Sequence, residues 1–580
     1  MSTRIRPSLA VTASPGRTGA AEDPGLGDAS RRQRTPALLA VLAVVVACAW
    51  FLTLDARHLL PADEGRYAEI AREMLASGDW ITVRYNGLKY FEKPPLQFWM
   101  TALAFKAFGI GEWQARLWTA LSGAAGLLAS AWAARRWYGA RVGVLTALVL
   151  LAAPAWNIGS HFASLDMALS GALAIVLAAV LIAQHPDASY GARRRWMAIA
   201  WAAMAVGVLT KGPVAIVLPG TTLIVYSAIT RDLAIWRRLH LGIGVVILLV
   251  IAVPWFVLIA QRNPEFLRFF FIHEHLQRYL SPIHHREGAW WYFVPQLLLG
   301  FLPWLGLSWQ MAKTVRAEPA GAGLRPALLL AVWAATIFVF FSFSDSKLPG
   351  YILPLYPALA ILAARTLDRL GPAPWRRQII AALGLMLIGA LATPWIARLG
   401  AGQTPNALYR SFALWLGVAV AAGAIGLVIA WQLRGRYPGR SIAAYALAFF
   451  ALTTIALRGH ESFGRSSSGV DLAARVAPLL EPAMPLYGVR LLDHTLPFYL
   501  RHPITIVETP GELEFGVGRE PQKWIPTLAG FVSAWTSGRR ALAVMSHPTY
   551  DELRAQHVPM QVVGEDVRRV VVANFETPGR

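Results

Sequence analysis

The sequence is poor in cysteine and poor in charge. Cys48 is the one cysteine among 580 residues, so an intramolecular disulfide cannot form. Charged residues make up 15% of the chain, whereas an ordinary soluble domain contains about a quarter. Hydrophobic residues reach 56% and the mean hydropathy is +0.45. These values exclude an ordinary soluble enzyme and indicate a polytopic membrane protein.

Acidic residues are also scarce, with 33 Asp and Glu against 54 Lys and Arg, which gives a net charge of +21. Such a surplus could indicate nucleic-acid binding. The basic residues, however, lie in short loops between apolar runs, as the cytoplasmic loops of membrane proteins do. We therefore expect anionic membrane lipids as partners and no nucleic acid. The 23 Trp residues fit belts at the membrane interfaces.

Apolar runs set the expected organisation. Residues 1–36 have no sustained apolar period and are predicted to be a disordered cytoplasmic tail. About thirteen helical spans are predicted within a membrane domain at 37–458, although several runs are shorter than the ~20 residues of a perpendicular span. The runs lie near residues 37–56, 113–133, 142–160, 165–184, 196–210, 213–229, 241–260, 290–311, 326–343, 350–366, 378–397, 411–432 and 441–458.

Loop charges support this arrangement. Counted from a cytoplasmic N-terminus, the arginine-rich loops, such as the one with Arg193 to Arg195, all fall on the cytoplasmic side. The first loop on the other side spans 57–112. Residues 459–580 are predicted to be a soluble α/β domain on that same side, because five strand-like runs (PLYGVR, ITIVE, ALAVMS, MQVVGED and RRVVVANF) alternate there with helical stretches. No GxGxxG or P-loop sequence occurs in that domain, so no nucleotide site is expected.

The first outer loop has the densest charge. Asp63 and Glu64 are adjacent there, close to the expected membrane edge. They could be a solvated boundary pair, but acidic residues so close to lipid more often face a ligand or a cavity. The following AEIAREMLASG stretch is predicted to be an amphipathic helix that lies flat on the membrane surface, with Glu69, Arg72 and Glu73 on its polar face.

A second carboxylate and a set of basic residues share this outer side. Asp166 lies at the outer end of another span. We expect it either to take part in the site or to brace the first loop. Interfacial snorkelling is the alternative for a lone lysine. Several basic groups on the side that such residues normally avoid instead suggest phosphate binding. These basic residues are Lys93, Lys211, Arg278 and Lys347.

A histidine-rich loop, HEHLQRYLSPIHHREG, could in principle hold a divalent metal such as zinc. His273 and His275 with Glu92 are the candidate ligands. The spacing is neither HExxH nor a CxxC framework, so the favoured interpretation is a polar, titratable loop and no required cofactor.

Taken together, the acidic pair, RYAEIAREM, YFEKPPL, TKGP, the HEH loop and SDSKLPGYILP resemble the bacterial 4-amino-4-deoxy-L-arabinose transferases that modify lipid A. These are polyprenol-phosphate-sugar-dependent glycosyltransferases of the GT-C fold, related to protein O-mannosyltransferases. The resemblance implies transfer of aminoarabinose from undecaprenyl phosphate to a lipid A phosphate, at the periplasmic face of a bacterial inner membrane. It also implies resistance to polymyxin and other cationic antimicrobial peptides.

The resemblance further implies residue roles. Catalysis is expected from Asp63, Asp166 and Glu92, with Asp63 acting either as a base or as an electrostatic partner. Donor-phosphate binding is expected from Lys93, Lys211, Arg278, Lys347 and Tyr351. The sugar pocket is expected to include Glu64, Arg66, Tyr67 and Tyr90.

Two other functions are compatible with the same pattern. A different GT-C enzyme would transfer mannose or glucose to a protein or glycan, and these motifs discriminate poorly between sugars. A transporter would more often have internal repeats and broken helices aimed at the bilayer midplane. The clustering of charge at one face favours the enzyme.

Overall fold

The computed structural model describes residues 41–277, 288–319, 323–400, 402 and 404–577. The predicted tail at 1–36 lies outside these residues. The chain divides into two compact units, Met1–Leu52 and Thr53–Arg580. In the first unit, residues 41–52 form one apolar helix. Every other element belongs to the second unit.

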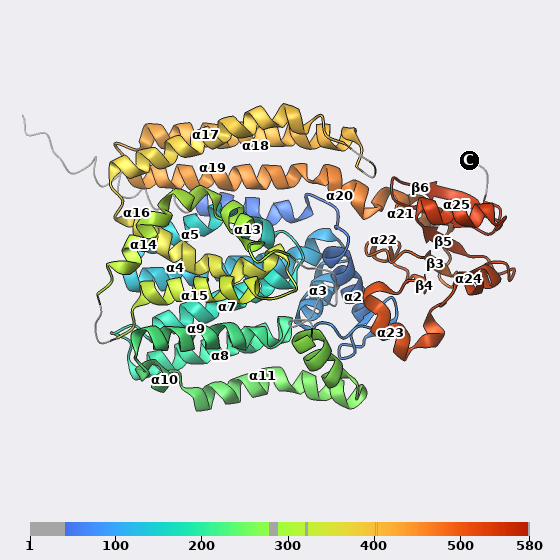
Figure 1. Cartoon of the computed structure of the whole chain (residues 1–580), viewed down its shortest axis with the longest axis horizontal. Helices are drawn as coiled ribbons and strands as arrows, with labels where there is room; N and C mark the ends of the chain where they lie inside the picture. Colours follow the sequence, from blue (N-terminus) through green and yellow to red (C-terminus); the bar gives the residue numbers. More distant parts are fainter. Residues whose placement is uncertain (1–40, 278–287, 320–322, 401, 403, 578–580) are drawn as a thin grey trace, which may run out of the picture. The chain divides into compact units, whose positions relative to one another are not determined.

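Long apolar helices make up most of the second unit and run side by side in Figure 1. Among the described residues, seven helices are long and apolar enough to cross a membrane, or eight if a bent pair counts as one span. The chain is therefore a polytopic helical membrane protein. The helices of this region are α4 (Glu112–Tyr138), α5 (Ala140–Ala152), α6 (Pro154–Ser160), α7 (Leu165–Ala183), α8 (Tyr190–Lys211), α9 (Val214–Thr230), α10 (Ala234–Arg237), α11 (Leu241–Arg262), the π-helix η2 (Arg268–Gln277), α13 (Phe293–Gly300), the 3₁₀-helix η3 (Leu302–Leu307), α14 (Ser308–Arg316), α15 (Pro326–Ser342), the 3₁₀-helix η4 (Pro349–Leu355), α16 (Tyr356–Asp368), α17 (Pro372–Ile396), α18 (Asn406–Leu433), α19 (Pro438–Gly459) and α20 (Glu461–Ser468).

Helical residues lie in all thirteen predicted apolar runs, but proline interrupts three of them. The α5–α6 pair bends by 70° where Pro154 begins α6. The run at 290–311 is split into α13, η3 and α14 around Pro303. The run at 350–366 starts as the 3₁₀-helix η4, which contains Pro354. A proline stands at each of these breaks, where it removes a backbone N–H and clashes with the preceding turn.

Helix α7 is the buried centre of the bundle. Almost all of its residues are buried, as expected for a helix that is apolar on every side. The Ser164 hydroxyl accepts a hydrogen bond from the Met167 N–H and caps its first turn. A Cβ at Gly171 would meet the backbone of Ser122 in α4, so glycine permits close packing of the two helices. A well-fixed α7 holds Asp166, its second residue, in a defined place.

The first loop folds into short elements. They follow the 3₁₀-helix η1 (Thr53–Asp55) and are α2 (Asp63–Ser77), β1 (Arg84–Tyr85), β2 (Leu88–Lys89) and α3 (Leu96–Phe108). Asn86 and Gly87 connect the two strands with φ angles of 50° and 72°. Positive φ at both positions is the requirement of the tight hairpin turn that Asn-Gly favours.

The C-terminal residues form a five-stranded sheet in the order β4-β3-β5-β7-β6. β3 pairs in parallel with β4 and β5, whereas β7 is antiparallel to β5 and β6. Its strands occupy the five strand-like runs of the sequence. They are β3 (Leu486–Val489), β4 (Thr505–Val507), β5 (Leu542–Met545), β6 (Gln561–Glu565) and β7 (Val570–Ala573).

Helices cover both faces of this sheet. Leu542 and Val544 of β5 face α21 (Val470–Val476) and α22 (Leu496–Leu500). Ala543 and Met545 face α24 (Leu528–Trp535) and α25 (His547–Ala555) on the other side. Alternate residues of a strand point to opposite faces, so each face has its own apolar core.

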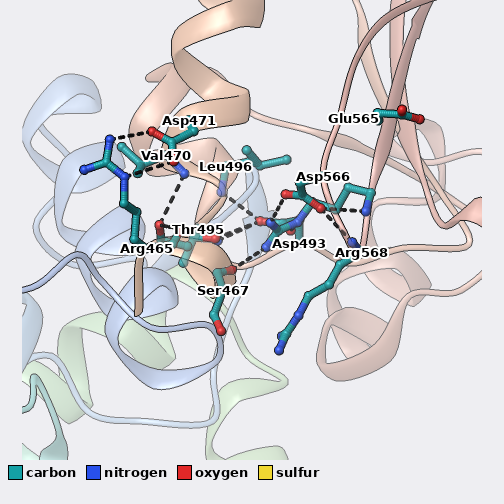
Figure 2. A network of polar contacts seen from close by, with 12 residues as sticks. Arg465, Ser467, Val470, Asp471, Asp493, Thr495, Leu496, Glu565, Asp566 and Arg568 are labelled. Carbon is teal, nitrogen blue, oxygen red and sulfur yellow. Dashed lines mark hydrogen bonds and ion pairs between the residues drawn. The ribbon is translucent and has the colours of Figure 1, made fainter. Parts of the chain in front are cut away.

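A polar network joins the sheet to the end of the helical bundle (Figure 2). Arg569 donates to Asp493 Oδ2 at 2.5 Å, to Asp566 Oδ2 at 2.9 Å and to the Ser467 carbonyl at 2.6 Å. The other oxygen of Asp493 accepts the Thr495 and Leu496 N–H groups at 2.9 and 2.8 Å. The network fixes the 493–496 segment, which contacts the first loop.

Helix α2 packs against this C-terminal part, so protein rather than solvent covers its predicted polar face. A Cβ at Gly65 would collide with the His494 carbonyl, so the two segments are in close contact. Glu69 is fully buried and binds Arg72 at 2.6 and 2.7 Å, while Glu73 accepts the Gly87 N–H. The polar face is therefore covered, because distant segments supply contacts that helical periodicity does not report.

Candidate functional site

Charged residues of the first loop and of the helix ends surround a cavity of about 410 Å³. Four segments supply most of its charge: the start of α2, the EKPP stretch before α3, the start of α7 and the end of α8. The middle of η2, the start of α9, the end of α15, the 344–348 loop and η4 complete the wall. The lining residues are Asp63, Arg66, Tyr67, Glu92, Lys93, Leu165, Asp166, Lys211, Pro213, Val214, Val217, Phe271, Glu274, Phe340, Phe341, Ser344, Ser346, Leu348 and Tyr351.

The first carboxylate of the cavity belongs to Asp63, the first residue of α2. Its Oδ1 accepts a hydrogen bond from Arg66 Nη2 at 2.5 Å. The Asp63 side chain is 38% exposed, while that of Arg66 is 3% exposed. A buried guanidinium thus holds a carboxylate that is open to the cavity.

Asp166 and Lys211 form the second charged pair. The Lys211 ammonium binds Asp166 Oδ1 and lies 4.2 Å from the centre of the Tyr351 ring. Gly212, with φ at +87°, ends α8 directly after Lys211. A Cβ at Gly350 would stand 2.9 Å from Asp166 Cβ, which accounts for glycine in KLPGY. The TKGP and KLPGY motifs therefore shape one wall.

Lys93 lies between two carboxylates. Its Nζ is 3.7 Å from Glu92 Oε2 and 3.5 Å from Glu274 Oε2. Tyr90 is buried and does not line the cavity, which corrects its predicted place in the sugar pocket. Its hydroxyl donates a hydrogen bond to Glu92 at 3.2 Å. Glu274 is a cavity residue that none of the predicted roles includes. The HEH motif that contains it is interpreted from the sequence as a polar, titratable loop, with a metal site as the alternative, and neither interpretation gives the Glu274 carboxylate a role.

Glu64 does not line the cavity, which corrects its predicted place in the sugar pocket. Its two oxygens accept hydrogen bonds from Arg57 at 2.7 and 3.0 Å and from Arg116 at 2.8 and 3.1 Å. The Leu60 and Ala163 N–H groups also donate to it. Burial favours the neutral acid, but the two guanidiniums outweigh it and hold the pKa of Glu64 far below its usual value.

Arg57 and Arg116 are the residues that the sequence interpretation missed here. Arg116 is fully buried near the start of α4, inside a predicted apolar span. An arginine in such a position needs a carboxylate partner. This signal was available in the sequence and predicts that Arg116 has a carboxylate partner, whereas the choice of Glu64 over Asp63 comes from the fold.

The remaining predicted site residues fall into two groups. Lys347 is buried beside the wall and donates to the Ser344 carbonyl at 2.5 Å, without lining the cavity. Arg278 and the His275 side chain lie outside the described residues. Within the described part of the chain, no group of three His, Cys, Asp or Glu residues is arranged to hold a metal ion. His273 Nδ1 lies 3.7 Å from Glu274 Oε1.

The arrangement is suited to a reaction in which opposite charges develop at neighbouring atoms. Carboxylates and cations face one small volume, and tyrosine and phenylalanine rings supply apolar walls. Low local polarity strengthens each of these electrostatic interactions.

Comparisons with known proteins agree with this geometry. Residues 37–270 match the family described as dolichyl-phosphate-mannose-protein mannosyltransferase, and residues 472–574 match the aminoarabinose transferase C-terminal domain. The first match includes the cavity residues from Asp63 to Val217, and the second covers the five-stranded sheet.

Relatives extend the likeness over most of the chain. An undecaprenyl phosphate-α-4-amino-4-deoxy-L-arabinose arabinosyl transferase of Pseudomonas fluorescens is 30% identical over 83% of this chain and 87% of its own. The enzyme of that name from Edwardsiella ictaluri is 34% identical over 57% of this chain and 59% of its own. The crystal structure of ArnT from Cupriavidus metallidurans bound to undecaprenyl phosphate superimposes with a TM-score of 0.90, at 52% identity over 93% of this chain and 98% of that one.

Proposed function

Because this chain belongs to the family of undecaprenyl phosphate-α-4-amino-4-deoxy-L-arabinose arabinosyl transferases, we propose that it moves aminoarabinose from undecaprenyl phosphate to a phosphate of lipid A. It is a glycosyltransferase of the GT-C type. The observation that carries the proposal is the cavity in which Asp63, Asp166 and Glu92 share one volume with Lys93 and Lys211.

The proposed reaction is a displacement at the anomeric carbon of the sugar. The bond between that carbon and the donor phosphate oxygen breaks, and undecaprenyl phosphate leaves with the electron pair. A phosphate oxygen of lipid A forms the new bond. Positive charge develops on the sugar and negative charge on the leaving phosphate, so carboxylates and cations stabilise different parts of the transition state.

The cations are assigned to the donor phosphate. Lys93 and Lys211 line the cavity, and Tyr351 lies against Lys211. Arg278 is assigned to this group because of the family resemblance. Lys347 does not line the cavity and acts through its hydrogen bond to the carbonyl of Ser344, which does. Ammonium and guanidinium groups bind phosphate more strongly than neutral donors do.

The carboxylates are assigned to the sugar and acceptor. Asp63, with Asp166 and Glu92, orients the acceptor and stabilises the sugar as positive charge develops. An acceptor phosphate is already ionised at neutral pH, so a strong general base is less necessary than for a hydroxyl acceptor. Arg66 and Tyr67 complete the sugar pocket, with Tyr90 supporting Glu92.

We place the enzyme in a bacterial inner membrane with about thirteen spans, the cavity and the C-terminal sheet being periplasmic. Helix α8 supports this orientation. Arg195 lies near its start and Lys211 is its last residue, which puts them ~24 Å apart along the helix axis. The arginine-rich end fits the cytoplasmic side and the cavity end fits the periplasmic side.

The reaction as proposed requires no metal, with zinc as the alternative. A purified sample dialysed against EDTA should transfer sugar at an unchanged rate. A loss of activity that added zinc restores would contradict this part of the proposal and assign a role to the histidine loop.

Lipid A mass spectrometry tests the function as a whole. The host should lack its own aminoarabinose transferase but make the lipid-linked donor. Cells that express the chain should gain lipid A species heavier by one aminopentose and should resist polymyxin, because the added amine offsets phosphate charge. Asp63→Asn should remove both effects at matched membrane levels, while Asp55→Asn, which changes an exposed carboxylate outside the cavity, should retain them.

The alternative function is that of a GT-C enzyme that transfers another sugar. Unmodified lipid A with well-folded protein would contradict the proposal and favour mannose or glucose transfer to a protein or glycan.

A further inference from the structure

The guanidinium of Arg66 has a second carboxylate partner, which comes from the C-terminal sheet region. Glu512 lies in the 3₁₀-helix η6 (Gly511–Leu513) and forms an ion pair with Arg66 Nη1. Asp63 binds Nη2 of the same guanidinium. The cavity wall includes Asp63 and Arg66 but not Glu512. One buried cation therefore connects a cavity carboxylate to a carboxylate on a distant part of the chain.

Aromatic rings enclose the rest of the guanidinium. The Arg66 Cζ lies 5.0 Å from the centre of the Tyr67 ring and 5.8 Å from that of Tyr90. Only 3% of the Arg66 side chain is exposed. A guanidinium so enclosed depends on its two anionic partners for stabilisation, because water cannot replace either of them fully.

The segment that carries Glu512 is fixed against the first loop. The Phe515 ring centre lies 5.5 Å from that of Phe91 and 4.0 Å from that of Phe269. A Cβ at Gly516, in α23 (Glu514–Arg519), would stand 2.7 Å from the Lys89 carbonyl. These contacts hold Glu512 at a defined distance from α2, so the fold itself fixes the ion pair between Glu512 and Arg66.

We propose that Glu512 is a positioning residue for sugar transfer, acting on Asp63 through Arg66. Glu512 fixes the orientation of the guanidinium, which in turn holds the Asp63 carboxylate in its place at the cavity. Without Glu512 the guanidinium turns, and Asp63 loses the orientation that sugar transfer requires. The C-terminal region thus contributes to the active site without touching substrate. This inference rests on the proposed function.

A second carboxylate of the same contact provides a matched control. Glu520 binds Arg84 at 3.1 Å and accepts the Lys89 N–H at 3.0 Å. Like Glu512, it joins the C-terminal region to the first loop, but it does not contact Arg66. Glu520→Gln therefore removes a comparable ion pair and leaves the Asp63–Arg66 geometry intact.

The test is steady-state transfer with purified full-length protein, undecaprenyl phosphate-linked aminoarabinose and lipid A. Glu512→Gln should lower kcat at least fivefold and leave the donor KM within twofold of the unchanged protein. Glu512→Asp should recover part of the lost kcat. Glu520→Gln should keep kcat within twofold. Melting temperatures of all variants, measured in the same detergent, separate positioning from general loss of structure.

Two results would overturn the inference. One is an unchanged kcat in Glu512→Gln while the unchanged protein transfers sugar, which leaves the proposed function standing. The other is an equal loss in Glu512→Gln and Glu520→Gln that follows their melting temperatures. Absence of transfer by the unchanged protein would instead overturn the proposed function, and the inference with it.

Discussion

Two charged regions meet at the start of α2 and differ in what surrounds them. In the cavity, Asp63 is held by one guanidinium and is 38% exposed. Immediately beside it, Glu64 is 3% exposed and is held by two guanidiniums and two backbone N–H groups. The same chemical group thus serves a site in one region and a structural core in the other. Neighbouring protein, rather than residue type, decides between these roles.

The largest expected effect is on catalysis through Asp63. Asp63→Asn should lower transfer at least about a hundredfold, since the cavity loses a charge that the transition state needs. Radiolabelled or mass-resolved transfer to lipid A measures this. The melting temperature should fall less than in Glu64→Gln, because Asp63 is partly exposed and Arg66 keeps Glu512 as a partner. Near-normal turnover would remove Asp63 from the mechanism.

Glu64→Gln should affect stability instead. It leaves Arg57 and Arg116 buried with a neutral partner, and loss of one member of a buried ion pair costs ~3–5 kcal/mol. Thermal or denaturant unfolding in detergent should register this loss. A Glu64→Gln protein that is as stable as the unchanged one, but inactive, would contradict the distinction between the two regions and return Glu64 to the site.

Lys211→Met tests the phosphate side of the cavity. Loss of a charge-assisted bond to phosphate costs ~1.5–3 kcal/mol, so the donor KM should rise about tenfold to a hundredfold. Lys347→Met is the paired variant, because Lys347 is buried beside the wall and donates to the Ser344 carbonyl. Its effect on KM should be smaller. Equal effects would show that both lysines bind donor.

The smallest expected effect concerns pH and the contact between α2 and the C-terminal region. Burial, aided by Arg66, lowers the pKa of His494 to about 4. From about pH 6.5 down to pH 4 the unfolded chain binds a proton that the folded protein does not, so stability falls as pH falls. This contributes at most ~2 kcal/mol by pH 5.

His494→Gln removes that titration. The loss of melting temperature between pH 7 and pH 5 should therefore be smaller in the variant than in the unchanged protein. An identical pH dependence in both proteins would show that His494 is accessible to protons in the folded state.

Much of the fold follows from the pattern of apolar runs. Helices lie in each of the predicted runs, and the five strand-like runs of the C-terminal part are the strands of its sheet. Burial of backbone in an apolar environment requires helices, so a run of apolar residues is a strong signal. Pro154, Pro303 and Pro354 can be read in the sequence as well. Each lies inside a long apolar run, however, and the length of the run favours one unbroken span.

Prediction of the site was less complete. The motifs singled out Asp63, Glu92, Lys93, Asp166, Lys211 and Tyr351, and all six line the cavity. They did not separate Asp63 from Glu64. Consecutive residues on a helix point about 100° apart, so Asp63 and Glu64 meet different neighbours, and only the surrounding elements decide which of them lines the cavity.

The sequence by itself determined that this chain is a membrane protein, where its helices lie and which residues carry the charges. Tertiary structure alone decided how those charges are paired. Arg116 reaches Glu64 across 52 positions and Glu512 reaches Arg66 from the far end of the chain. Electrostatic interactions depend on distance and burial, and both are set when segments remote in sequence pack together.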